Sequence, residues 1–131
     1  MIATDEVNEI FADAHTMYES ALERWGAGDM RDAAEKAWCA TLRATNALLL
    51  ARTGEVPEKT PETSGRLDRL ARMTPEVRSL LGRYYSRQQR LHGDCFYSGI
   101  MAYADEIERR IRETIDYITD AEALAFSADR P

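Results

Sequence analysis

The sequence predicts an all-α protein that folds as an up-and-down bundle of four long helices and one short helix. Three observations support this fold class. Apolar residues recur at three- and four-residue steps along most of the 131 residues, no stretch alternates in the manner of a strand, and the segments between the periodic stretches are brief. The length is that of one ordinary domain, so residues 1–131 are expected to form a single domain.

The first helix is expected over residues 5–25, where apolar residues from Val7 to Trp25 form one stripe. The segment Gly26-Ala27-Gly28-Asp29 ends it, and its aspartate is a suitable N-cap for the next helix. This second helix, at about 30–52, is apolar nearly all round. A helix with so little polar surface belongs at the centre of a bundle or in a subunit interface.

Gly54 stops the second helix, and residues 53–64 are expected as a loop because they contain Pro57 and Pro61. A short third helix follows at about 64–73, anchored by only a few apolar residues.

The segment Thr74-Pro75-Glu76 then supplies a cap, a first-turn proline and an acidic residue, and it opens a fourth helix that is expected to reach about residue 95. Ser98-Gly99-Ile100 predicts a break, and isoleucines at three- and four-residue steps predict the last helix at about 102–125.

Composition and short motifs indicate which classes of protein can be excluded. The 17 basic and 23 acidic residues give a formal charge of −6, and no apolar run is long enough to span a membrane. The N-terminus lacks the order of a signal peptide, and Cys39 and Cys95 form no Cys-x-x-Cys pair, so we expect a cytoplasmic protein with reduced thiols. No Glu-x-x-His pair or phosphate-binding glycine loop is present, so no metal and no cofactor are expected.

Basic residues gather in one region. Residues 66–92 hold seven arginines against two acidic residues. Such a segment either attracts phosphate groups locally or forms a solvated helix face whose arginines pair with acidic helices nearby.

The fourth helix carries an apolar face with polar residues at its edges. On an ideal α-helix this apolar arc consists of Val77, Leu80, Leu81, Tyr84, Leu91 and Cys95. Arg87 and His92 flank the arc on opposite sides, about 140° apart, and Gln88 lies within it, where an amide needs a partner. If the arc packs on a second copy of the chain across a two-fold axis, Arg87 of one copy approaches His92 of the other. We therefore expect a homodimer.

These residues resemble a known signature. The stretch Arg87-Gln88-Gln89-Arg90-Leu91-His92 is similar to the pattern of an arginine, four to six residues and a histidine in the HEPN superfamily (higher eukaryotes and prokaryotes nucleotide-binding). Ala34-Glu35-Lys36-Ala37-Trp38 extends the resemblance. Leu91-His92-Gly93-Asp94-Cys95-Phe96-Tyr97 is similar to the small archaeal PaREP branch, and the resemblance covers roughly residues 8–122.

The resemblance implies a dimeric helical bundle, often a metal-independent endoribonuclease of toxin–antitoxin or defence systems. Other members are non-catalytic partners of nucleotidyltransferases. By this resemblance Arg87 stabilises the phosphate at the scissile bond, His92 acts as acid or base on the ribose 2′-hydroxyl or the leaving oxygen, and Glu35 orients one of them. The candidate RNA contacts are Arg83, Arg90, Gln88 and Tyr84.

Each candidate also has a structural interpretation. Arg87 would pair with an acidic residue of another helix, His92 would stabilise a helix C-terminus, Glu35 would form a salt bridge, and Tyr84 would lie at the edge of the core. Two other functions stay open: a non-catalytic bundle that holds a phosphate, a small ligand or a protein, and a peptide-binding tetratricopeptide-like unit within residues 18–37. No second copy of such a unit follows.

Overall fold

A computed structural model of the chain describes residues 4–127. The helix α1 (Thr4–Gly26) and the helix α2 (Met30–Thr53) form an antiparallel hairpin, as expected. Gly28 takes a left-handed φ of 84° in the connection, a conformation that glycine adopts without steric cost. The Asp29 carboxylate caps α2 by accepting a hydrogen bond of 3.1 Å from the amide of Asp32.

The third helix begins earlier than predicted. α3 spans Thr60–Met73, and the expected loop up to residue 64 is wrong at its C-terminal end. Pro61 lies in the first turn, where its missing N–H costs no helical hydrogen bond, so this proline starts the helix instead of excluding it.

The fourth helix is not a continuous α-helix. A 3₁₀ turn, η1 (Pro75–Val77), leads into α4 (Arg78–Arg87), and the chain then continues as a π-helical segment, η2 (Gln88–Tyr97). At the end of η2 the amide of Ser98 bonds to the carbonyl of Gly93, five residues back, at 3.0 Å. π-Helical turns are rare and are frequent at functional sites.

The predicted last helix is divided. α5 (Ala104–Arg112) and α6 (Thr114–Phe126) are separated at Glu113, although neither proline nor glycine stands there. The predicted break before them is confirmed, and Gly99 has a left-handed φ of 70° within it.

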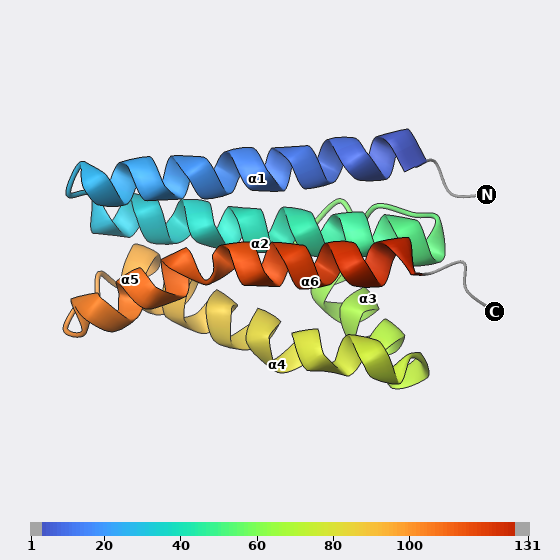
Figure 1. The fold of residues 1–131 in the computed structure, drawn as a ribbon. Coiled ribbons are helices and arrows are strands. Elements are labelled where there is room, and N and C mark those ends of the chain that lie inside the picture. The colour runs from blue at the N-terminus through green and yellow to red at the C-terminus, as the bar shows by residue number, and fades with distance from the viewer. Residues whose placement is uncertain (1–3, 128–131) are drawn as a thin grey trace.

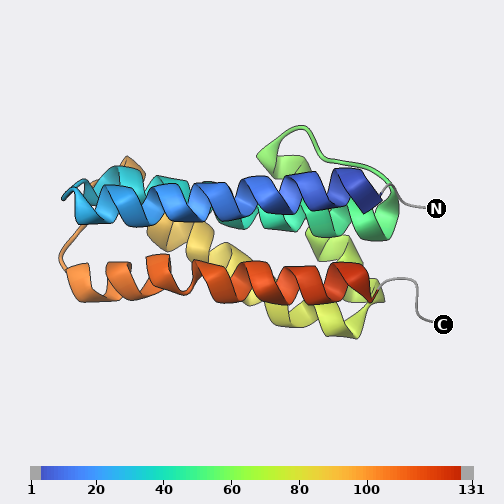
Figure 2. The same ribbon diagram turned by 45° about the horizontal axis from the view of Figure 1, so that its top comes forward.

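The elements form an all-helical up-and-down bundle, which confirms the predicted fold class. α1 and α2 lie side by side, α6 runs along α2, and α4 with η2 crosses beneath them (Figures 1 and 2). α2 is central, which is one of the two positions expected for it, and thirteen of its 24 residues are buried. Among the described residues, the helices include none that is both long and apolar enough to cross a membrane.

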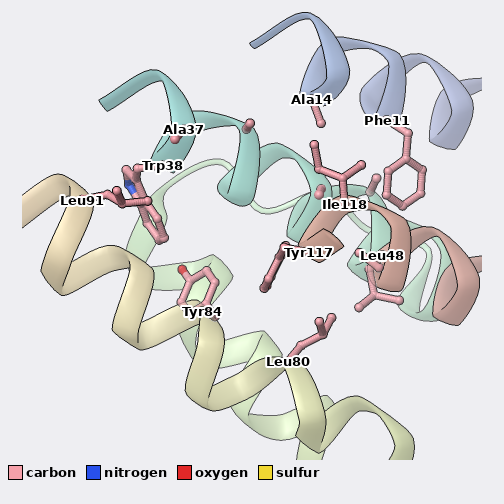
Figure 3. Packing of buried hydrophobic residues seen from close by; sticks show 14 of the residues in the cluster. Phe11, Ala14, Ala37, Trp38, Leu48, Leu80, Tyr84, Leu91, Tyr117 and Ile118 are labelled. Carbon is pink, nitrogen blue, oxygen red and sulfur yellow. The ribbon is translucent and has the colours of Figure 1, made fainter. Parts of the chain in front are cut away.

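The core explains why the apolar arc of the fourth helix does not face a second copy. Leu80, Tyr84 and Leu91 are fully buried inside the chain, and Tyr84 packs on Trp38 of α2 with 5.2 Å between ring centroids (Figure 3). The expectation that this arc forms a dimer contact is therefore wrong, because the chain's own helices already cover it.

Candidate functional site

A histidine and a glutamate meet where α2 packs against η2. His92 Nδ1 lies 2.7 Å from Glu35 Oε1, and the two side chains are 40% and 24% exposed. An ionised carboxylate only accepts hydrogen bonds, so Nδ1 carries the hydrogen and donates it. In the neutral ring the second nitrogen, Nε2, is then left as an acceptor. This is how a carboxylate fixes the tautomer and orientation of a histidine that acts as a base.

Aromatic rings hold the imidazole in place. The ring of Phe96 stacks on it at a centroid distance of 5.9 Å and an interplanar angle of 27°, and the indole of Trp38 lies 6.4 Å away. Trp38 follows Glu35 by three positions on α2, so one turn of this helix supplies both the carboxylate and the indole that lie next to His92.

The pair opens onto a cavity of about 440 Å³, which we call the His92 cavity. Its walls come from α2, the first turns of α3 and the start of η2. The lining residues are Glu35, Trp38, Cys39, Leu42, Thr60, Pro61, Ser64, Gln88 and His92. Apolar walls with a few polar groups are typical of a small-ligand site. Burial, and then the negative charge of Glu35, raise the pKa of the Cys39 thiol, so this cysteine is not an activated nucleophile.

Arg87 lies on another side of the helix. Its side chain is 5% exposed; Nε donates to Thr41 Oγ1 at 2.9 Å, and Nη2 donates to Thr114 Oγ1. Burial lowers its pKa to about 10, so the guanidinium is still charged at neutral pH. The structural interpretation expected an acidic partner. The structure instead provides two threonine hydroxyls.

Arg87 also lines a cleft of about 360 Å³, the Arg87 cleft, together with Gly82, Arg83, Ser86, Arg110, Glu113 and Asp116. This cleft shares no lining residue with the His92 cavity. Within one chain the structure thus brings Glu35 to His92 and keeps Arg87 apart from both.

The other candidate RNA contacts are dispersed. Arg83 pairs with Asp120 at 2.7 Å, and Arg90 pairs with Asp94 at 3.1 Å. Tyr84 is fully buried and its hydroxyl lies 2.8 Å from Ser64 Oγ, which leaves no face of the ring open to a base. Of the four candidates, Gln88 alone lines the His92 cavity.

The family comparison agrees with part of the sequence-based resemblance. The model of the archaeal PaREP1/PaREP8 family matches residues 9–125. The chain belongs to this family. Comparisons with curated proteins and with solved structures gave no match. The matched span contains the His92 cavity and the Arg87 cleft of this PaREP1/PaREP8 protein.

A second histidine–glutamate pair occurs on the opposite part of the bundle. His15 Nε2 of α1 lies 3.2 Å from Glu122 Oε2 of α6, and the side chains are 40% and 30% exposed. His15 is bonded through Nε2 and His92 through Nδ1, so the two pairs differ in the nitrogen that is left free. In this PaREP1/PaREP8 protein the His15–Glu122 pair can therefore serve as a control for substitutions of His92 and Glu35.

Sequence reasoning missed the two threonines that hold Arg87. Thr41 stands in the apolar run of α2, and a hydroxyl there is a weak signal for a buried polar partner, whereas nothing marks Thr114. In residues 4–127 of the PaREP1/PaREP8 chain, His, Cys, Asp and Glu side chains form no cluster of three or more that could hold a metal ion.

Proposed function

We propose that this PaREP1/PaREP8 protein is a HEPN-type protein that cleaves single-stranded RNA by acid–base catalysis, with His92 as the catalytic residue and Glu35 as its positioning residue. The observation that carries the proposal is the hydrogen bond of 2.7 Å between Nδ1 and Oε1 at the edge of the His92 cavity. It leaves Nε2 free to exchange a proton with a bound substrate.

The proposed step is an internal transesterification. His92 Nε2 takes the proton of a ribose 2′-hydroxyl, the 2′-oxygen attacks the neighbouring phosphorus, and the bond to the 5′-oxygen of the next nucleotide breaks. The proton then passes to the leaving oxygen. The products are a 2′,3′-cyclic phosphate and a 5′-hydroxyl end. The reacting groups are RNA and the imidazole, and no metal takes part in the step.

The phosphate charge needs a cationic partner, and no arginine or lysine lines the His92 cavity. We therefore propose a homodimer, in which Arg87 of the second copy stabilises the phosphate. Arg87 Nη1 has no hydrogen-bond partner among residues 4–127, and the Arg87 cleft connects this side chain to solvent. Arg83 lines the same cleft and would hold a flanking phosphate. Dimerisation has to use a surface other than the buried apolar arc.

One observation favours a second candidate function, a non-catalytic partner of a nucleotidyltransferase in a toxin–antitoxin pair. Arg87 is buried and already bonded to Thr41 and Thr114 of its own chain. A guanidinium used in this way stabilises the bundle and need not contact RNA. This candidate predicts a complex with the nucleotidyltransferase and no cleavage of RNA.

The test is cleavage of single-stranded RNA by the purified protein in EDTA, with analysis of the product ends. The wild-type protein should produce cyclic-phosphate ends. His92→Ala should lower the rate by about 10²- to 10⁴-fold, which is the usual contribution of an acid–base group. Glu35→Gln should lower it by less, about 10-fold.

The second histidine–glutamate pair supplies the controls. His15→Ala and Glu122→Gln remove groups of the same chemistry and similar exposure from another part of the bundle, and they should leave the rate unchanged. Cleavage that persists in His92→Ala, or that falls equally in His15→Ala, would exclude His92 as the catalytic residue. Absence of cleavage together with binding of a nucleotidyltransferase would favour the second candidate.

A further inference from the structure

Gln88 stands out among the side chains of the His92 cavity. It is the first residue of the π-helical segment and is partly buried, and among residues 4–127 its side-chain amide has no hydrogen-bond partner. No buried side-chain nitrogen or oxygen of the described chain lacks a partner. The amide of Gln88 is therefore accessible, and the space next to it is the cavity that it lines. The amide offers one acceptor and two donors to whatever enters.

Gln88 is close to the proposed reacting group. It precedes His92 by four residues in the same helical segment, and both side chains line one cavity. If the ribose lies against Nε2 of His92, the base of that same nucleotide lies within the cavity. The base next to Gln88 then belongs to the nucleotide on the 5′ side of the cleaved bond.

The remaining walls suit a flat heteroaromatic ring. Leu42 and Pro61 provide apolar surface for the faces of a ring, and the Thr60 hydroxyl, which also has no side-chain partner among residues 4–127, stands at the start of α3. A volume of about 440 Å³ is in the range of cavities that hold small ligands. A glutamine amide pairs with two adjacent groups of adenine, donating to N7 and accepting from N6.

We propose that Gln88 is the specificity-determining residue of the His92 cavity and selects adenine in the nucleotide whose ribose faces His92. This inference rests on the proposed action on RNA, and it adds a base preference that acid–base chemistry alone does not require. Cleavage is then expected on the 3′ side of adenosines in single-stranded RNA.

Binding tests the inference separately from cleavage. The probes are short uridine oligomers with one central 2′-deoxynucleotide carrying adenine, guanine, cytosine or uracil, which lack the 2′-hydroxyl nucleophile at that position. Protection of Cys39 from alkylation reports occupancy, because this partly buried thiol lines the cavity, while the fully buried Cys95 serves as the unreactive reference. Mass spectrometry assigns the label. The adenine oligomer should protect at about one-tenth of the concentration that the other three need.

Substitutions then assign the preference to Gln88. Gln88→Leu keeps the approximate volume and removes the amide, and Gln88→Ala covers the case in which leucine disturbs the π-helical turn. Both should abolish the roughly tenfold preference for adenine. Gln89→Leu is the matched control, because Gln89 is the next residue and is exposed. It should retain the preference. Thermal unfolding of each variant verifies that it is folded.

The outcomes separate this inference from the proposed function. Equal protection by all four oligomers, or a preference that survives in both Gln88 variants, overturns the role of Gln88. Adenine preference without cleavage of all-ribose RNA supports Gln88 as the base-reading residue and overturns the endoribonuclease. Cleavage without base preference supports the endoribonuclease and overturns the inference about Gln88.

Discussion

Two sides of one helix differ sharply in this protein. His92 is 40% exposed, bonded to a carboxylate and open to a cavity, whereas Arg87, five residues earlier, is 5% exposed and bonded to two hydroxyls between α2 and α6. The first environment leaves a polar group available to a substrate, and the second uses a polar group to hold helices together. The two members of the arginine–histidine signature therefore differ in their expected effects: substitution of Arg87 should change stability as well as cleavage, and substitution of His92 should change cleavage alone.

The largest stability effect is expected at Arg87. Arg87→Ala should lower the free energy of unfolding by about 2–4 kcal/mol, because it leaves a cavity between three helices. Arg87→Met keeps much of the volume and removes a charge that burial disfavours, so it should cost less than about 1 kcal/mol or even stabilise the protein. Urea denaturation measures both variants. Equal losses in the two variants would show that the hydrogen bonds to Thr41 and Thr114 outweigh the filled volume.

Alkaline pH should also weaken the bundle, because three of its tyrosines have raised pKa values. Burial raises the pKa of Tyr117 and Tyr84, and burial with the hydrogen bond to Asp68 raises that of Tyr85 to about 12. A tyrosine whose pKa is higher in the folded state stabilises the folded protein at any pH below its ordinary pKa of 10.0. This contribution is lost as the pH rises through the pKa of the folded state. Arg87 opposes this loss, because its pKa is lowered from 12.5 to about 10 and the unfolded chain binds the proton more tightly.

The loss of stability from the three tyrosines should exceed the gain from the one arginine. The urea concentration at the unfolding midpoint should therefore decrease as the pH is raised from about 9 to about 11. Tyr117→Phe removes one of the raised groups and should make the fall shallower. Arg87→Met removes the opposing group and should make it steeper. A midpoint that does not change over this range would contradict the burial of these side chains.

The smallest stability effect is expected on the His92 side. Partly exposed polar pairs contribute about 0–1 kcal/mol, so His92→Ala and His15→Ala should each change the free energy of unfolding by less than about 1 kcal/mol. This result would show that any loss of RNA cleavage in His92→Ala is a chemical effect. A loss of several kcal/mol at His92 alone would instead assign the residue to the fold.

The architecture could be predicted from the sequence because the apolar composition of α2 indicates that this helix is buried. A helix with so little polar surface is expected at the centre of a bundle or in a subunit interface, and the structure places α2 at the centre, with thirteen of its 24 residues buried. The start of α3 was placed too late because Pro61 is compatible with both a loop and a first helical turn. The division at Glu113 was not predicted, since neither proline nor glycine marks it and the isoleucine spacing continues across it.

The site was less predictable because tertiary contacts determine it. A helical wheel at 100° per residue assumes an α-helix, and nothing in the stretch around Gln88 marks the change to π-helical turns. The wheel did separate Arg87 from His92, but it could not show that Thr41 and Thr114, both distant in sequence, enclose the guanidinium. Glu35 was named beside His92 only through the family resemblance, since 57 residues separate them along the chain.

Nitrogen NMR of the two neutral histidine rings shows whether Glu35 fixes the His92 ring with Nε2 free. We predict opposite tautomers: the hydrogen on Nδ1 in His92, which faces Glu35 through that atom, and on Nε2 in His15, which faces Glu122 through the other. Glu35→Leu should shift the His92 ring toward the Nε2–H tautomer and leave His15 unchanged. An Nε2–H tautomer for His92 in the wild-type protein, or no response to Glu35→Leu, would show that Glu35 does not orient this ring.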